Sequence, residues 1–202
     1  MRRPGGAHGV QGCPGGAGLG RRLSFATVPE LLASAEQHFG DAPAIVTTQR
    51  SESFRELARA TRSAAMALRR RGLDRGDRVL MAAANSPSLI HVWLGAIWAG
   101  GIPAAVNPEL TASEIDYLRE HLRPAVTLLN GEVEALESTV TESDTPAAAV
   151  EPLEVAAIVY TSGTTSRPKG VMVRHAAYTE TGASFPGWMG LKSPQRLFVC
   201  LP

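Results

Sequence analysis

The feature that most constrains the fold is a regular alternation between apolar runs and helix-start signals. Four runs rich in Val, Ile, Leu and Ala lie at residues 78–83, 102–106, 125–129 and 155–160. Their length and lack of polar interruptions are typical of strands that are buried on both faces. Because helical segments lie between them, the pattern predicts an α/β fold with a mainly parallel sheet and helices on both faces.

Three helix starts are marked by capping boxes, in which a Ser or Thr and a glutamate three residues later satisfy free backbone amides. The pairs are Thr27 with Glu30, Ser53 with Glu56, and Thr111 with Glu114. Ser86 followed by Pro87 marks a fourth, apolar helix. We therefore expect a helix at each position, the second being amphipathic and ending near Gly72.

Composition limits where a folded domain can lie and what it can bind. Residues 1–22 are rich in Gly and Pro, so we expect a disordered tail or a wrongly assigned start there, followed by one domain over 23–202. The 202 residues include 20 basic and 19 acidic side chains, which gives no field to attract nucleic acid. The apolar stretches are broken by polar residues, Gly and Pro, which argues against a membrane span. The two cysteines lack metal-ligand spacing and the density of a secreted disulfide scaffold, so we expect a cytoplasmic protein.

The strongest functional signal is a hydroxyl-rich loop that follows the fourth apolar run. The loop offers hydroxyl donors, a glycine that lets backbone amides converge, and a lysine. The hydroxyls belong to Thr161, Ser162, Thr164, Thr165 and Ser166, the glycine is Gly163 and the lysine is Lys169. A polyphosphate requires these three kinds of group. The loop is not a Walker A sequence, because Pro168 stands where that pattern has its second Gly. A plain Ser/Thr turn between two core elements is the alternative.

From Tyr160 to Val171 the chain resembles the signature loop of the acyl-adenylate-forming (AMP-forming) synthetases and ligases. That loop reads approximately Tyr-Thr-Ser-Gly-(Ser/Thr)-Thr-Gly-x-Pro-Lys-Gly-Val, and Ser166 stands where the family usually has Gly. Further matches in family order include Asn85-Ser86-Pro87 and Val106-Asn107-Pro108. The resemblance covers residue 27 to the end. Within the family, this part of the chain is most similar to the acyl-CoA synthetases.

The resemblance implies a reaction in which a carboxylic acid attacks the α-phosphate of ATP, releasing pyrophosphate, and coenzyme A then captures the acyl-adenylate. It assigns the ATP phosphates, with Mg²⁺, to Thr161, Ser162, Gly163, Thr164, Thr165, Ser166, Lys169 and Gly170. By the same resemblance, none of these residues is a proton-transfer catalyst. His38, His91 and His121 are scattered without a partner four residues away, so we expect no metal site. Since the family's adenine, ribose and lid motifs come later than Pro202, we expect an incomplete N-terminal part of the large adenylate-forming domain, inactive alone.

Two other hypotheses stay open beside that of an N-terminal acyl-CoA synthetase fragment. The chain could be a non-catalytic ATP- or polyphosphate-binding module, or one half of a split enzyme whose C-terminal part a partner chain supplies. It could also be an inactive gene remnant. Among other candidate residues, we expect His175 to have the structural role of an ordinary helix cap or surface residue. An acyl pocket is the alternative to core positions for five large apolar residues, and we expect the core for Trp93, Trp98, Trp188, Phe185 and Met189.

Overall fold

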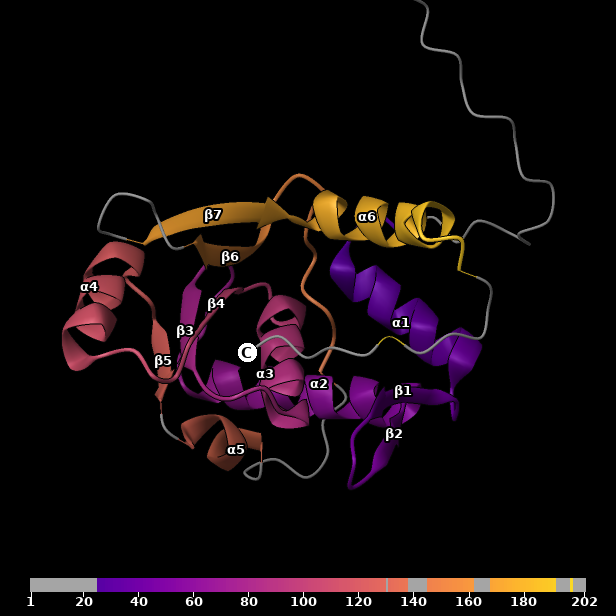
Figure 1. Ribbon diagram of the computed structural model, residues 1–202, viewed down its shortest axis with the longest axis horizontal. Coiled ribbons are helices and arrows are strands. Elements are labelled where there is room, and N and C mark those ends of the chain that lie inside the picture. Colours follow the sequence, from indigo (N-terminus) through magenta and orange to yellow (C-terminus); the bar gives the residue numbers. More distant parts are fainter. Residues whose placement is uncertain (1–24, 130, 138–144, 162–167, 192–196, 198–202) are drawn as a thin grey trace, which may run out of the picture.

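The computed structural model describes residues 25–129, 131–137, 145–161, 168–191 and 197 (Figure 1). The tail expected at residues 1–22 therefore lies outside the described residues. The elements in chain order are α1 (Val28–Phe39), β1 (Pro43–Val46), β2 (Ser51–Ser53), α2 (Phe54–Arg70), β3 (Arg78–Ala82), α3 (Pro87–Trp98), β4 (Ile102–Val106), α4 (Ala112–Leu122), β5 (Val126–Leu129), α5 (Glu132–Glu137), β6 (Val155–Thr161), β7 (Lys169–Arg174) and α6 (His175–Trp188). None of the described helices is long and apolar enough to cross a membrane.

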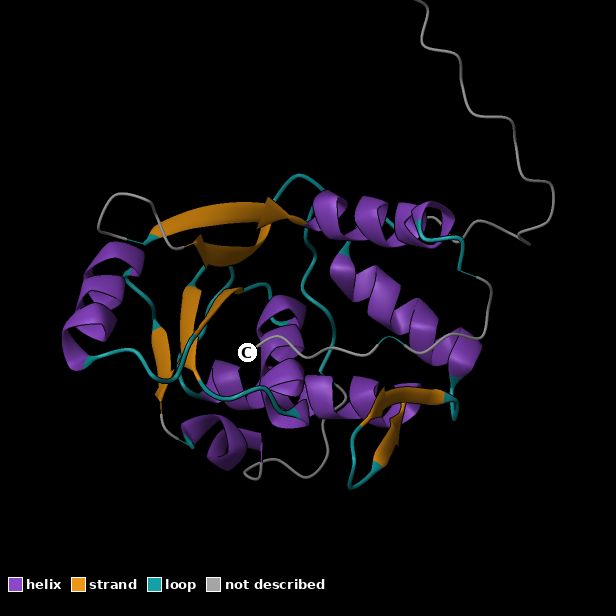
Figure 2. Ribbon diagram, viewed as in Figure 1, coloured by secondary structure: helices purple, strands orange, loops and turns teal. Residues whose placement is uncertain are grey.

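A three-stranded parallel sheet in the order β4-β3-β5 lies at the centre, with helices on both of its faces (Figure 2). Val79 and Met81 of β3 point to one face, where they join a buried cluster with side chains of α2, α3 and α5. Leu80 points to the other face and packs with Leu118 and Leu122 of α4. This period of two follows from strand geometry. The expected α/β fold with a parallel sheet covered on both faces is confirmed.

The fourth apolar run takes a different place from the one expected. Instead of extending the parallel sheet, β6 pairs antiparallel with β7, and Val159 lies opposite Val171. The hairpin packs beside β4, with Ile158 against the cluster around Leu80. Val159 is 45% exposed, so the expectation of burial on both faces is wrong here. The physical reason is that the hairpin covers the sheet with one face and leaves the other uncovered by described residues.

The local helix signals are confirmed. All three capping boxes form, at the starts of α1, α2 and α4. The Ser86 hydroxyl accepts a hydrogen bond from the Leu89 amide at 3.1 Å and caps α3. Helix α2 ends with Gly72 at φ 88°, and the Leu73 amide donates back to the Leu68 carbonyl at 3.1 Å. This is a Schellman ending, in which glycine is favoured because φ is positive.

The tryptophans divide between core and surface. Trp98 is buried and donates from Nε1 to the carbonyl of Thr145 at 2.8 Å, and Trp93 packs edge-on against Tyr178. Trp188 is 75% exposed and Met189 is also exposed, so the expectation of core positions for these two is wrong. The buried residues of α6 lie in its first two turns, and Trp188 lies in its last turn.

His175 connects two segments that are far apart in sequence. Its side chain is buried, and Nδ1 accepts a hydrogen bond from the backbone amide of Val28 at 3.3 Å. The start of α6 is thereby joined to the start of α1. His175 is therefore structural, as expected, but it is buried and is neither a helix cap nor a surface residue. Burial lowers its pKa from 6.5, although the carboxylate of Glu154 acts in the opposite direction.

This burial predicts how His175 contributes to stability as the pH changes. Its pKa is lower in the folded than in the unfolded chain, so the unfolded chain binds the proton first as the pH falls. The contribution is therefore complete above pH 6.5 and is lost as the pH falls below that value. A His175→Asn variant keeps an acceptor without the titration. We expect the stability advantage of the original chain over this variant, measured by denaturant unfolding, to shrink between pH 7.5 and pH 5; a constant difference would contradict the prediction.

Candidate nucleotide site

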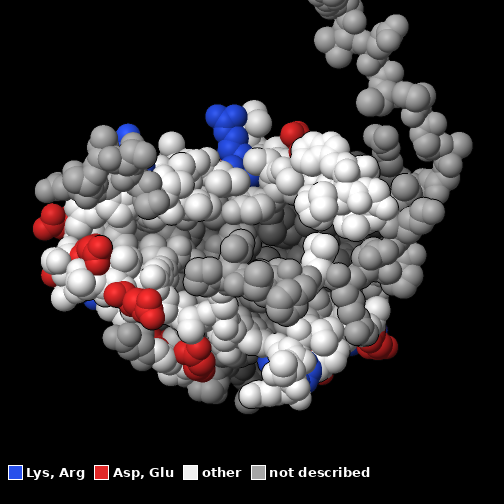
Figure 3. Space-filling view, viewed as in Figure 1, with Lys and Arg blue, Asp and Glu red and all other residues white. Residues whose placement is uncertain are grey.

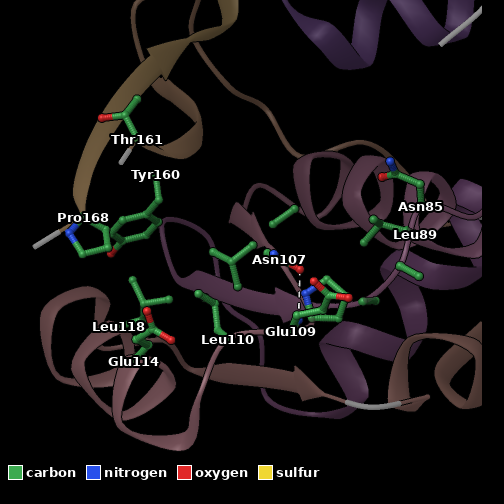
Figure 4. Close-up of a pocket in the computed structure, with 15 residues that line it drawn as sticks. Asn85, Leu89, Asn107, Glu109, Leu110, Glu114, Leu118, Tyr160, Thr161 and Pro168 are labelled. Atoms are coloured by element: carbon green, nitrogen blue, oxygen red, sulfur yellow. Dashed lines mark hydrogen bonds between the residues drawn. The ribbon is translucent and has the colours of Figure 1, made fainter. Parts of the chain in front are cut away.

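The carboxyl ends of β3 and β4 line one side of a cavity of about 670 Å³ (Figure 4). The chain leaves β3 toward α3, on one face of the sheet, and leaves β4 toward α4, on the other face. In parallel α/β sheets, such a divergence of neighbouring connections opens a crevice in which ligands bind. Residues 83–85 after β3 and residues 105–110 around the end of β4 form these walls.

The β6–β7 hairpin brings its open end to the same cavity. Tyr160, Thr161 and Pro168 all line it, and Figure 4 shows Tyr160 pointing from β6 toward the side of Leu118. Thr161 and Lys169 form the last cross-strand pair, and the Thr161 hydroxyl donates to the Lys169 carbonyl at 3.5 Å. The two ends of the hydroxyl-rich loop are therefore held at the carboxyl edge of the parallel sheet.

The sequence-predicted site residues divide into two groups. Thr161, Lys169 and Gly170 are described, and Thr161 and Lys169 are exposed at the open end of the hairpin. The other predicted phosphate contacts, Ser162, Gly163, Thr164, Thr165 and Ser166, lie outside the described residues. The structure thus places the flanks of the predicted site.

Gly170 has a packing reason that the sequence did not indicate. A Cβ atom at this position would lie 3.0 Å from Cγ2 of Ile158 and 3.5 Å from the ring of Tyr160. Contacts of 3.0 Å are tighter than ordinary van der Waals contact, so a side chain would push against β6. Glycine here allows the Tyr160 ring to lie against β7.

Several residues that line the cavity or contact the hairpin beside it were not identified as site residues from composition and motif chemistry. Asn107 follows directly after β4, and its Oδ1 accepts a hydrogen bond from the Glu109 amide at 2.9 Å. Asn85 is the third residue after β3, and both asparagines line the cavity (Figure 4). Tyr117 and His121 of α4 contact the hairpin. The asparagines could have been found from their position after two predicted parallel strands. The two α4 residues are four apart, which places them on one helix face.

Burial also affects the tyrosine at the hairpin end. The pKa of Tyr160 is raised above 10.0, first because the hydroxyl is partly removed from water and second because Tyr117 is close. At neutral pH the Tyr160 side chain is therefore a neutral hydroxyl that can donate or accept a hydrogen bond. Among the described residues there is no group of three or more His, Cys, Asp or Glu side chains that could hold a metal ion.

Comparisons with known proteins identify the family of the chain. A family model described as AMP-binding enzyme matches residues 32–202. Surfactin synthase subunit 1 of Bacillus subtilis (strain 168) is 31% identical over 160 residues, covering 74% of this chain and 4% of the relative. The 3-hydroxybenzoate--CoA/4-hydroxybenzoate--CoA ligase of Thauera aromatica is 30% identical over 197 residues, covering 81% of this chain and 37% of the relative.

A solved structure shares the fold. The Klebsiella oxytoca NpsA N-terminal subdomain in complex with anthranilyl-AMSN superposes with a TM-score of 0.68 at 26% identity, covering 77% of this chain and 43% of that one. The chain spans less than half the length of each of these proteins. The family match nevertheless extends over most of the chain and includes the loop and both cavity walls. The chain belongs to the AMP-binding enzyme family of adenylate-forming ligases.

Proposed function

We propose that the chain binds the phosphates of ATP at the open end of the β6–β7 hairpin and supplies this site for AMP-forming activation of a carboxylic acid. The observation that carries the proposal is the position of the family loop, whose two ends meet at a cavity on the carboxyl edge of the sheet. The proposed phosphate contacts are Thr161, Ser162, Gly163, Thr164, Thr165, Ser166, Lys169 and Gly170.

In the proposed reaction, a carboxylate oxygen bonds to the α-phosphorus and the bond from that phosphorus to the pyrophosphate oxygen breaks. Negative charge then accumulates on the leaving pyrophosphate. The ammonium group of Lys169 would stabilise this charge, and the hydroxyls of the loop would orient the phosphates. A thiol, proposed to be that of coenzyme A, would then take the acyl group from the adenylate and release AMP. None of the proposed residues transfers a proton.

The distribution of charge supports phosphate binding on the hairpin side of the cavity. Glu109 and Glu114 belong to the cavity wall, and Figure 3 shows acidic side chains gathered over α4 and α5 on the face drawn. Lys169 is exposed at the end of the hairpin. A polyanion is attracted to the lysine and repelled by the carboxylates, so the triphosphate would lie along β7.

The described residues fit a Mg²⁺ ion that arrives with the nucleotide. Such an ion takes most of its oxygen ligands from phosphate and water, and it needs no preformed cage of carboxylates. The hydroxyl of Thr161 would be an available protein oxygen at the hairpin end. When bound, the ion would share the neutralisation of the phosphate charge with Lys169.

The relatives support the substrate class at a coarse level. The Thauera aromatica protein is named as a ligase that joins hydroxybenzoates to CoA, and the NpsA subdomain was solved with anthranilyl-AMSN. We propose a carboxylic acid as substrate and an acyl-CoA as product. Because the chain spans 37% of the Thauera aromatica ligase, we further propose that it does not complete the reaction by itself.

Replacing Lys169 by alanine should weaken binding of Mg-ATP about tenfold or more, because a charge-assisted contact with phosphate is lost. The side chain is exposed, so the fold should persist. Isothermal titration calorimetry gives the dissociation constant, and the thermal unfolding midpoint reports the fold.

Arg174→Ala is the matched control for this experiment. Arg174 lies on the same strand as Lys169, is also exposed, and pairs with Val155 at the opposite end of the hairpin. The Arg174→Ala substitution also removes one positive charge, but at a position away from the cavity. Affinity that falls in Lys169→Ala and stays unchanged in Arg174→Ala supports the proposed site. Equal affinities in all three proteins would remove Lys169 from it.

One observation favours a second candidate, in which the chain is one half of a two-chain enzyme. Val159 and Val171 lie opposite each other on the same face of the hairpin, and both side chains are exposed. Adjacent exposed apolar side chains on a strand pair are typical of a surface that another polypeptide covers. Size-exclusion chromatography of the chain alone and with a candidate C-terminal partner tests this. A chain that stays monomeric in both samples excludes a stable complex with that partner.

A further inference from the structure

Helix α4 contacts both sides of the open end of the hairpin, at Tyr160 of β6 and at Pro168, the residue before β7. The Tyr117 hydroxyl donates to the carbonyl of Pro168 at 3.3 Å. Nδ1 of His121 forms a hydrogen bond of 2.9 Å with the hydroxyl of Tyr160. The three rings also contact one another, with Tyr117 stacked on His121 and His121 edge-on to Tyr160. One helix face therefore holds the residue that precedes Thr161 and the residue that precedes Lys169.

Helix α4 is itself fixed to the parallel sheet. Leu118 and Leu122 are buried against Leu80 of β3. Arg78, the first residue of β3, donates from Nε to the carbonyl of Leu122 at 3.1 Å and from Nη2 to that of Arg123 at 2.7 Å. These bonds satisfy carbonyls at the end of the helix that lack an internal partner. The α4 contacts thus relate the hairpin end to the sheet edge that forms the cavity.

Other contacts hold the hairpin at positions away from the cavity. The other end of the hairpin leads into α6, where the His175 amide donates to the Glu154 carbonyl at 3.1 Å. Ile158 packs into the cluster around Leu80. The hairpin is therefore held by burial and backbone bonding away from the cavity. The hydrogen bonds of Tyr117 and His121 add to this by fixing the orientation of the open end of the hairpin.

We propose that Tyr117 and His121 are positioning residues that hold Thr161 and Lys169 in the orientation that receives the phosphates of the nucleotide. This inference rests on the proposed function. The two side chains touch the loop flanks and act through them. Their hydrogen bonds supply orientation, and their loss should lower affinity for any polyphosphate, with or without an adenosine group.

The test uses a double variant, Tyr117→Phe with His121→Phe, which keeps both aromatic rings and removes both hydrogen bonds to the hairpin. Calorimetry measures the affinity of the chain for Mg-ATP and for Mg-tripolyphosphate. We expect both affinities to fall about tenfold, since two hydrogen bonds that set orientation are lost. The thermal midpoint should stay close to that of the original chain. If the double variant does not fold, the single variant Tyr117→Phe, with an expected loss of about threefold, decides.

The controls are Tyr178→Phe and His38→Phe, which make the same chemical changes elsewhere. Tyr178 packs on Trp93, and His38 bonds to Ser34 on the exposed side of α1. A loss of affinity for both probes in the α4 variants alone supports the inference. Binding by the original chain with no loss in the α4 variants overturns the inference and leaves the proposed function standing. Absence of binding to either probe by the original, folded chain overturns both.

Discussion

Replacing Glu52 by alanine should lower the free energy of unfolding by about 2 kcal/mol, because it removes a buried carboxylate that is hydrogen-bonded to the buried His91 side chain. Oε1 of Glu52 lies 2.7 Å from Nε2 of His91, and both side chains are less than 10% exposed. Oε2 lies 3.4 Å from the guanidinium of Arg50. The pair joins β2 to α3. Removing the carboxylate takes away the acceptor that Nε2 of His91 contacts. The free-energy cost of burying this nitrogen away from water is then no longer balanced by that hydrogen bond. Guanidinium unfolding at pH 7 measures the loss.

The control is Asp116→Ala, which breaks an ion pair of 3.3 Å between Asp116 and Arg119 on the exposed side of α4. Exposed pairs contribute little, so the expected change is about 0.5 kcal/mol or less. Glu52→Gln retains an acceptor oxygen and should fall between these two. Equal changes in the free energy of unfolding for Glu52→Ala and Asp116→Ala would contradict the prediction that the buried Glu52 contact contributes more to stability than the exposed pair.

Local signals in the sequence predicted the helices well. Each capping box depends only on a side chain and amides three residues away, so Ser53 and Glu56 specify a helix start without knowledge of the fold. The same holds for Gly72, whose positive φ serves one helix end. Among the described helices longer than ten residues, α1, α2, α3 and α4 begin at a predicted cap, and α6 does not.

The direction of β6 could not be predicted from its apolar run alone. Burial and β-branched residues indicate a strand, but they do not say which neighbour it pairs with or in which direction. The signal that was overlooked is the following run from Val171 to Val173. The link at residues 162–168 is shorter than the dozen or so residues that a parallel connection requires, so the two runs had to form a hairpin. The hairpin, in turn, is what places Lys169 beside Thr161.

One part of the candidate site, the loop, could be predicted from the sequence, whereas the residues that support it could be identified only from the structure. The loop was found from its residue types and spacing, and the structure describes its flanks at the cavity. The contact of Tyr117 with Pro168 joins residues 51 apart, and that of His175 with Val28 joins residues 147 apart. Such contacts depend on how helices pack against the sheet, which local spacing does not encode. The supporting residues of a site are therefore harder to predict than the residues that touch its ligand.

The substitution Gly95→Ala should lower the free energy of unfolding by about 2 kcal/mol, because α3 crosses α2 too closely to admit a side chain there. A Cβ atom at Gly95 would lie 2.7 Å from Cβ of Ala64, 2.9 Å from the backbone nitrogen of Ala65 and 3.0 Å from the carbonyl oxygen of Thr61. Two of these are backbone atoms of a helix that cannot move alone. The two helices would have to separate, and the buried cluster around Leu68 and Val92 would lose contacts.

The same substitution at Gly182 should have the opposite sign. Gly182 lies inside α6, and a Cβ atom built there meets nothing within 4 Å among the described residues. Alanine then restricts the unfolded chain and favours the helix, so stability should rise by up to about 1 kcal/mol. Denaturant unfolding of both variants separates the effect of helix propensity, which is common to the two sites, from the steric cost, which only Gly95 bears. A gain in stability in both variants would mean that α2 and α3 separate at little cost.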